Sequence, residues 1–212
     1  YIRELMKVFS QNGGKFINAK VEDFGFQNKK ISSVHTENGN FECDKAIITA
    51  GIWSKELMLK LGLNIPLEAE RGYHVVYKNA SILPRNPMMM TIGKFGVTPM
   101  GSDLRCAGTV ELGGIKLGPS KAPIKLLRRR VAEAFPKMCY DKTEEWFGFR
   151  PTAPDSLPLI GQLKESGVYT AFGHQHIGMT SGPKTGRLIA DIINQRSPNI
   201  DISVYDPNRY NL

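Results

Sequence analysis

The chain lacks the marks of several protein classes. No apolar run approaches the ~20 residues that a membrane-spanning helix needs. The first residues, Tyr1-Ile2-Arg3-Glu4, lack the charged start, apolar stretch and cleavage site of a secretory signal. There is no initiator methionine either, so we expect a fragment or a processed product.

Cysteine is scarce. The three cysteines, Cys43, Cys106 and Cys139, are far apart and form no CxxC or Cys/His spacing, which argues against a disulfide framework or a zinc site. Cys43 and Cys106 lie in apolar, strand-like stretches and are predicted to be small buried hydrophobes. We therefore expect a reducing, cytoplasmic compartment.

The net charge of +8 over 212 residues raises the question of nucleic-acid binding. Most basic residues are scattered, and the densest cluster is Arg128-Arg129-Arg130. This cluster sits within a helical pattern, where consecutive residues fan around the axis instead of forming one patch. A solvated helix face is therefore the better interpretation, and no nucleic-acid partner is expected. The positive charge still favours acidic partners or anionic substrates.

Hydrophobic residues make up 41% of the chain and charged residues 23%, as in a soluble globular protein. Its first part predicts an α/β arrangement. Apolar spacing predicts an amphipathic helix over residues 2–9 that the pair Gly13-Gly14 stops. The pair Asn38-Gly39 predicts a hairpin turn. The remaining elements expected here are a strand at 15–21, hairpin strands at 31–36 and 40–43, a strand at 45–51 buried on both faces, and a helix at 53–61 with Trp53, Leu57, Met58 and Leu61 inward.

The pattern changes after Pro66 to short β-like pieces separated by Gly, Pro and Asn-Pro, which is typical of an antiparallel sheet. The expected elements are strands at 71–78, 88–92, 95–100, 104–110 and 147–150, a helix at 122–135, a buried strand at 168–172 and a last helix at 181–194. The predicted fold is α/β plus α+β. A small antiparallel domain at 66–146 is inserted between two pieces of an α/β layer, 1–65 and 147–212.

The strongest local signal is the segment from Val168 to Pro183. A buried strand ends there, glycines open a loop, and a helix begins with Ser or Thr near its cap and Pro in its first turn. The start of such a helix suits an anion, or a group that becomes anionic during a reaction, and the glycines allow a planar ligand to approach the backbone. An ordinary strand–loop–helix turn fits the pattern equally well.

Several segments taken together go beyond pattern, and their order along nearly the whole chain is specific. They resemble the D-amino-acid dehydrogenase branch of the FAD-dependent amino-acid oxidase superfamily. The matching segments are Ala50-Gly51-Ile52-Trp53-Ser54, Arg71-Gly72-Tyr73, Ala107-Gly108-Thr109-Val110-Glu111, Gly148-Phe149-Arg150-Pro151-Thr152-Ala153-Pro154-Asp155, Leu157-Pro158-Leu159-Ile160-Gly161, Gly173 to Gly178, and the ending from Asp201 to Tyr210.

The resemblance implies an FAD-binding α/β domain, formed here by 1–65 and 147–212, and a substrate domain on an antiparallel sheet at 66–146. The family also begins with a strand–GxGxxG–helix unit that holds the FAD pyrophosphate. No GxGxxG occurs in this chain, and Tyr1 aligns to the middle of a full-length member. We therefore expect this chain to be the C-terminal half, to bind FAD weakly or not at all on its own, and to have the N-terminal half as a partner.

The resemblance also implies site residues but no catalytic base. Arg150 matches the arginine that pairs with the substrate carboxylate, a task that suits a planar guanidinium. Tyr73 contacts substrate or is a core aromatic. The positions implied for FAD are Val21 at the adenine, the turn of Ala50, Gly51 and Trp53, and Gly173, His174, Ile177, Gly178, Met179 and Thr180 against the isoalloxazine ring. The pair His174 and His176 lacks further ligands, so packing is favoured over a metal site.

The activity that the resemblance implies is hydride transfer from the α-carbon of a D-amino acid to FAD, giving an imino acid that hydrolyses to a 2-oxo acid. Electrons would pass to oxygen or to a membrane quinone, with peripheral contact to the inner membrane. A glycine or sarcosine oxidase, or the flavin domain of a tRNA-modifying enzyme, remains open within the same class. The alternative from another class is a non-catalytic module that needs a partner chain to bind FAD.

Overall fold

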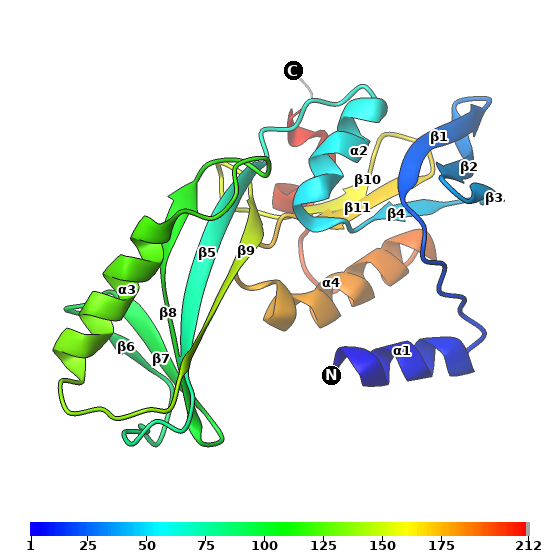
Figure 1. Cartoon of the computed structure of the whole chain (residues 1–212). Coiled ribbons are helices and arrows are strands. Elements are labelled where there is room, and N and C mark those ends of the chain that lie inside the picture. The colour runs from blue at the N-terminus through cyan, green and yellow to red at the C-terminus, as the bar shows by residue number, and fades with distance from the viewer. Residues whose placement is uncertain (211–212) are drawn as a thin grey trace.

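A computed structural model describes residues 1–210 and contains three sheets (Figure 1). The large antiparallel sheet has the order β6-β7-β8-β5-β9, with β5 Glu68–Tyr77, β6 Met88–Met90, β7 Phe95–Met100, β8 Asp103–Leu112 and β9 Thr143–Thr152. A second sheet has the order β10-β11-β4, with β4 Ala46–Ile48, β10 Leu159–Gln162 and β11 Val168–Phe172. The third is the antiparallel β1-β2-β3, with β1 Val21–Gln27, β2 Lys30–Thr36 and β3 Gly39–Glu42. This mixture of α/β and antiparallel structure is the predicted fold class.

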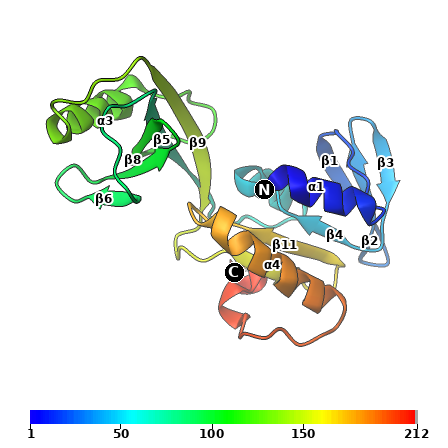
Figure 2. The same ribbon diagram turned by 90° about the horizontal axis from the view of Figure 1, so that it is seen from below.

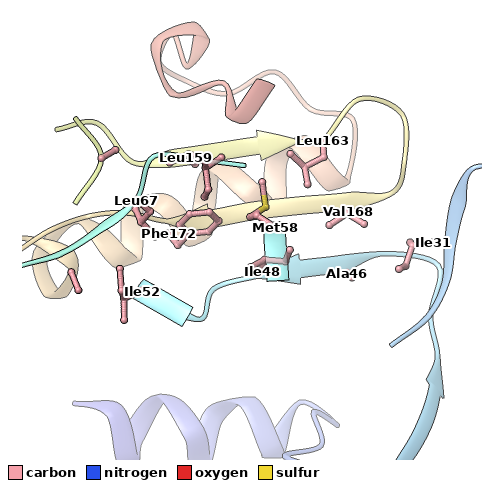
Figure 3. Packing of buried hydrophobic residues seen from close by; sticks show 13 residues of the cluster. Ile31, Ala46, Ile48, Ile52, Met58, Leu67, Leu159, Leu163, Val168 and Phe172 are labelled. Carbon is pink, nitrogen blue, oxygen red and sulfur yellow. The ribbon is translucent and has the colours of Figure 1, made fainter. Parts of the chain in front are cut away.

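Helices cover both sides of the β10-β11-β4 sheet (Figure 1), and Figure 3 shows the buried apolar residues that pack in this layer. On one side α2, Ser54–Lys60, places Met58 with no exposed surface against Ile48, Leu159 and Phe172. On the other side α4, Gly178–Ile193, packs against β10 and β11 through Leu188 and other apolar residues. These two apolar layers exist because successive residues of a strand point to opposite faces.

The large sheet has one covered face and one open face. Val75 and Cys106 pack against Leu127 and Val131 of α3, Lys121–Ala134, in a single apolar cluster. The other face carries polar and aromatic residues. We call it the open face and define it by Gly72, His74, Arg105, Trp146 and Arg150, which the strand register places on one side.

The arginine cluster of α3 spreads around the helix as predicted. Arg128 reaches Glu145 of β9 at 2.8 Å, Arg129 lies 3.7 Å from Glu133, and Arg130 donates to the carbonyl of Gly93 at 2.9 Å. The three guanidinium groups therefore serve three different contacts and form no common patch.

The first helix is confirmed, although its apolar side chains are not buried. α1, Ile2–Gln11, contains no buried residue, and Ile2, Leu5 and Phe9 are 57%, 50% and 48% exposed. In Figure 2, α1 (blue) is drawn next to β4 and the β1-β2-β3 sheet, and no strand lies between α1 and the viewer. Within residues 1–210, no helix combines the length and apolarity that crossing a bilayer requires.

Several local predictions were wrong. Residues 15–20 form no strand, and β1 begins only at Val21. Ile47 is 46% exposed, so β4 is buried on one face only. The reason is that α4, on the side of Ile47, packs against β10 and β11 instead of β4. Trp53 is 53% exposed, because it ends a 3₁₀ turn, Gly51–Trp53, before α2 begins. The last helix starts at Gly178, three residues earlier than predicted.

Strand β9 is also longer than predicted. It pairs antiparallel with β5 along its whole length, from Thr143 opposite Tyr77 to Thr152 opposite Glu68. The proposed domain boundary between residues 146 and 147 therefore falls inside one strand. The β9 strand leads directly from the large sheet towards the β10-β11-β4 layer (Figure 1).

The end of the described chain is tied to the loop after β9. Two 3₁₀ turns, η2 Ser203–Tyr205 and η3 Pro207–Tyr210, lie there. Arg209 Nε donates to Asp155 Oδ2 at 2.8 Å, and Arg209 Nη2 donates to the Leu157 carbonyl at 2.9 Å. Burial alone would raise the pKa of Asp155, but hydrogen bonds from Arg209 and from the Leu157 N–H lower it to about 2.

We predict that Met58→Ala lowers the free energy of unfolding by about 2–5 kcal/mol, because it leaves a cavity in a fully packed layer. Leu59→Ala is the matched control in the same helix. Leu59 is 50% exposed, so its loss should cost about 0.5 kcal/mol or less. Urea unfolding of both variants measures the difference, and similar losses for the two would contradict the packing described.

A second prediction concerns acid. A carboxyl with a lowered pKa stabilises the fold fully above its ordinary value of 3.8, and this stabilisation is lost as the pH falls through about 2. Asp155→Asn should therefore be less stable than the wild type near neutral pH, by about 1 kcal/mol or less for this partly exposed pair. The difference should shrink towards zero as the pH approaches about 2. Urea unfolding across this range tests it, and a pH-independent difference would contradict it.

Candidate active site

The candidate site begins at one edge of the β10-β11-β4 sheet. β4 and β11 are parallel neighbours, with Ala46 opposite Val168 and Ile48 opposite Thr170. The turns that follow them, 49–53 and 173–177, therefore leave the same edge of the sheet. In α/β sheets the carboxyl ends of parallel strands are the usual place for a ligand. The structure thus brings the predicted Ala50–Trp53 and Gly173–Ile177 segments to one edge.

The end of β9 contacts both turns. The Gln175 N–H donates to the carbonyl of Pro151 at 3.2 Å. The Trp53 ring lies edge-to-face on Phe149, with centroids 6.4 Å apart at an interplanar angle of 89°. Arg150 is the residue between these two contacts, so β9 carries it to the edge where the two turns lie.

The glycine turn is built for a tight change of direction. Gly173 is buried with a φ of +91°, a left-handed conformation that glycine adopts at little cost. α4 then begins after Ile177 without a side-chain cap. The hydroxyls of Thr180 and Ser181 donate back to the Ile177 carbonyl at 2.8 and 2.9 Å. Neither hydroxyl therefore occupies the N–H groups of the first turn, which suit a partly negative ligand group.

Large apolar side chains at this edge are exposed. Trp53, Ile177 and Met179 are 53%, 52% and 65% exposed. Exposed apolar side chains beside the start of α4 fit a planar ring with a polar rim, such as isoalloxazine. The residues present are therefore compatible with FAD.

The two histidines of the loop do not act together. His174 Nε2 is hydrogen-bonded to the Thr185 hydroxyl at 2.8 Å, and burial lowers the pKa of His174. The ring is thus neutral and packs the loop onto α4. His176 is exposed. Across residues 1–210, no group of three or more His, Cys, Asp or Glu side chains could hold a metal ion.

Arg150 lies on the open face over a glycine floor. Gly72 of β5 is paired directly with Gly148 of β9. A Cβ atom on Gly72 would stand 2.5 Å from Arg150 Nη2, and one on Gly148 would stand 2.2 Å from the Trp146 ring. The guanidinium and the indole therefore lie flat against the two glycines. Within the described residues, no hydrogen bond or ion pair engages the Arg150 guanidinium, which leaves it free to bind an anion.

Tyr73 is not part of this surface. It is 2% exposed and lies on the α3 side of the sheet, because it is one residue from Gly72 in β5. Its hydroxyl donates to Glu111 and accepts from the Ser120 N–H at 3.3 Å. The Arg71 guanidinium, 2.7 Å from Glu111, completes a buried polar cluster. Of the two interpretations of Tyr73, substrate contact or core aromatic, this burial and bonding favour the core aromatic.

Val21 lies apart from the other predicted residues. It starts β1 and pairs with Thr36 in the third sheet. That sheet joins the layer at Ile31, whose N–H donates to the Ser166 carbonyl ahead of β11. Ile31 is opposite Phe26 at the turn end of the β1–β2 hairpin, whereas Val21 is at the other end, so this contact does not bring Val21 to the Gly173 turn.

The sequence prediction missed the rest of the open face. His74, Arg105 and Trp146 were not singled out as site residues, and Gly72 and Gly148 only as parts of motifs. The pairing register of β5 with β8 and β9 would have found them, but the predicted strand at 147–150 was too short to define that register.

Comparison with known proteins identifies the family. The family model described as FAD dependent oxidoreductase, DAO, matches residues 1–192. A D-amino-acid oxidase of Bradyrhizobium diazoefficiens is 36% identical over 99% of this chain and 51% of its own length. A glycine oxidase of Pseudomonas aeruginosa is 31% identical over 84% of this chain and 49% of its own length.

A solved structure shares the fold. Glycine oxidase from Geobacillus kaustophilus superposes with a TM-score of 0.80 at 24% identity, covering 92% of this chain and 53% of that one. The chain spans about half the length of the curated relatives that it matches. With the family model covering most of its residues, this chain belongs to the DAO family of FAD-dependent oxidoreductases.

Proposed function

We propose that the protein oxidises D-amino acids with FAD and that Arg150 holds the substrate carboxylate. The observation that carries the proposal is the position of Arg150. The Arg150 guanidinium is unpaired and lies on the open face. Its neighbours in β9 contact the two turns: Phe149 packs on Trp53, and the Pro151 carbonyl accepts the Gln175 N–H. The similarity to a D-amino-acid oxidase supports the choice of substrate class.

Arg150 can fix the orientation of the substrate. A guanidinium binds a carboxylate through two parallel charge-assisted hydrogen bonds, which set both position and plane. The Gly72–Gly148 floor lets the guanidinium lie close to the sheet, so the bound carboxylate stands above the open face. The α-carbon is then directed towards the edge formed by the Ala50–Trp53 and Gly173–Ile177 turns.

The proposed cofactor residues surround that edge. The residues that would hold the ring system are Ala50, Gly51, Trp53, Gly173, His174, Ile177, Gly178, Met179 and Thr180. FAD, when bound, accepts the hydride that leaves the substrate α-carbon. The positive end of α4 stabilises negative charge that develops beside it. Val21 is proposed for the distant adenine end.

We assign no side chain the role of general base. His174 is held by Thr185 and has a lowered pKa, which suits packing more than proton uptake. The substrate amine needs only to be neutral, and the resulting imino acid hydrolyses in water to a 2-oxo acid and ammonia. Oxygen or a membrane quinone is the proposed electron acceptor.

Glycine oxidation is the second candidate, because a glycine oxidase is 31% identical over most of this chain. The open face favours the larger substrates. Trp146, 55% exposed, borders the glycine floor and offers an apolar surface to a substrate side chain, which glycine lacks.

The test uses protein expressed from the complete coding sequence and saturated with FAD. Anaerobic D-alanine should bleach the visible flavin absorbance faster than glycine does. Arg150→Gln should lower kcat/KM for D-alanine by about 100-fold, since a charge-assisted bidentate contact is lost. Arg150→Lys should recover part of it, because the charge remains without the planar fork.

Arg129→Gln is the control, because it removes one positive charge from a 69% exposed side chain on α3. It should change kcat/KM by less than about twofold. Unchanged turnover in Arg150→Gln would remove the proposed carboxylate site. A colourless protein that takes up no FAD would support the non-catalytic module instead, and faster bleaching with glycine would support the second candidate.

A further inference from the structure

A second arginine shares the open face with Arg150. Arg105 of β8 is opposite Val76 of β5, and Arg150 of β9 is opposite Glu70 of β5. Paired residues in an antiparallel ladder point to the same side, and positions two apart along a strand also share a side. Both arginines therefore lie on the face of the sheet that residues 70, 72, 74 and 76 of β5 share.

The two side chains converge from opposite ends of β5. Arg105 Nη2 is 3.2 Å from His74 Nδ1. Arg150 Nη2 lies 2.5 Å from the position of a Cβ on Gly72. The two guanidinium groups thus reach neighbouring same-side positions of β5, which are about 7 Å apart along a strand. In agreement, burial and then the positive charge of Arg150 lower the pKa of Arg105.

His74 orients Arg105 without neutralising it. The imidazole stacks on Trp146, with centroids 4.8 Å apart and planes at 18°. Burial, followed by the charge of Arg105, lowers the pKa of His74 to about 4, so the ring is neutral near neutral pH. Its Nδ1 can then accept the Arg105 N–H while the remaining donors of the guanidinium stay available.

Acidic side chains do not balance these charges. Among the described residues, neither Arg105 nor Arg150 forms an ion pair. Glu70 is on the same face, yet it bonds neither arginine. Glu144 is also on this face, opposite Val76, and lies 3.3 Å from Lys142 and 3.9 Å from Lys78. Asp103 is bonded to Lys78, and Glu111, towards α3, is bonded to Arg71. Two close cations without counter-ions favour a ligand that brings two negative charges.

Resting on the proposed function, we propose that Arg105 and His74 form a second subsite that binds the side-chain carboxylate of an acidic D-amino acid, D-aspartate or D-glutamate. The α-carboxylate lies at Arg150 and the second carboxylate at Arg105. Because Gly72 and Gly148 let the Arg150 guanidinium and the Trp146 ring lie close to the sheet, the connecting carbon atoms pass above these two side chains.

Substrate pairs of equal shape test the charge itself. In the FAD-saturated protein, kcat/KM for D-aspartate and D-glutamate should exceed that for D-asparagine and D-glutamine by about tenfold or more. Arg105→Gln should remove this preference, lowering kcat/KM about 30-fold for the acids and less than about threefold for the amides. Arg105→Lys keeps the charge and should keep part of the preference. Arg129→Gln, on α3, should leave the preference unchanged.

Binding of inert carboxylates gives a readout that does not depend on turnover. By titration calorimetry, Arg105→Gln should weaken glutarate about tenfold and leave butyrate unchanged, whereas Arg150→Gln should weaken both. Equal use of D-aspartate and D-asparagine by the wild type, or equal losses for both in Arg105→Gln, would overturn the subsite. Oxidation of the neutral D-amino acids would then still support the proposed function. A different result would separate the two proposals. If glutarate binding needs both arginines but no D-amino acid reduces the flavin, the subsite is retained and the proposed function is rejected.

Discussion

The pairing of β9 with β5 is the constraint on which the rest of the structure depends. The two strands pair over all ten residues of each, and the register sets Gly148 against Gly72. Because side chains alternate, a slip of one residue would turn Arg150 towards α3 and remove it from the open face. The same strand then reaches the Gln175 and Trp53 turns through Pro151 and Phe149. One strand thus connects the open face, where we propose that an anion binds, to the edge proposed for the flavin.

The two faces of the large sheet differ in whether their arginine side chains are paired with acidic ones. Towards α3, Arg71 is 1% exposed and bonded to Glu111 and to the Gly114 carbonyl, so its charge is compensated inside the protein. Hydrogen bonds from Tyr73, Ser120 and Arg71 lower the pKa of Glu111 to about 2, which keeps the pair ionised. On the open face, Arg105 and Arg150 have no such partners. A buried charge must be paired, whereas an unpaired cation on an accessible face is available to a ligand.

Glycine serves two distinct purposes around the site. Gly173 allows the left-handed turn that redirects the chain from β11 into α4. Gly72 and Gly148 have ordinary strand conformations, and their value is the missing side chain, which lets a guanidinium and an indole lie against the sheet. The chain therefore combines a left-handed turn at the edge proposed for the flavin with a flat glycine floor on the open face, where we propose that the substrate binds.

Local sequence patterns were sufficient for much of the fold. Neighbouring residues were enough to predict the Asn38-Gly39 hairpin, the α1 periodicity with its glycine stop, α3 and the β11–loop–α4 unit, and the ordered motifs indicated the family. Tertiary structure alone decided which face each strand residue occupies. The local pattern did not reveal that Tyr73 points to α3, that Trp53 is exposed, or that Arg105 and His74 share a face with Arg150. Those outcomes depend on register between strands about 30 to 80 residues apart, and pairing at that separation is set by the packing of the whole sheet.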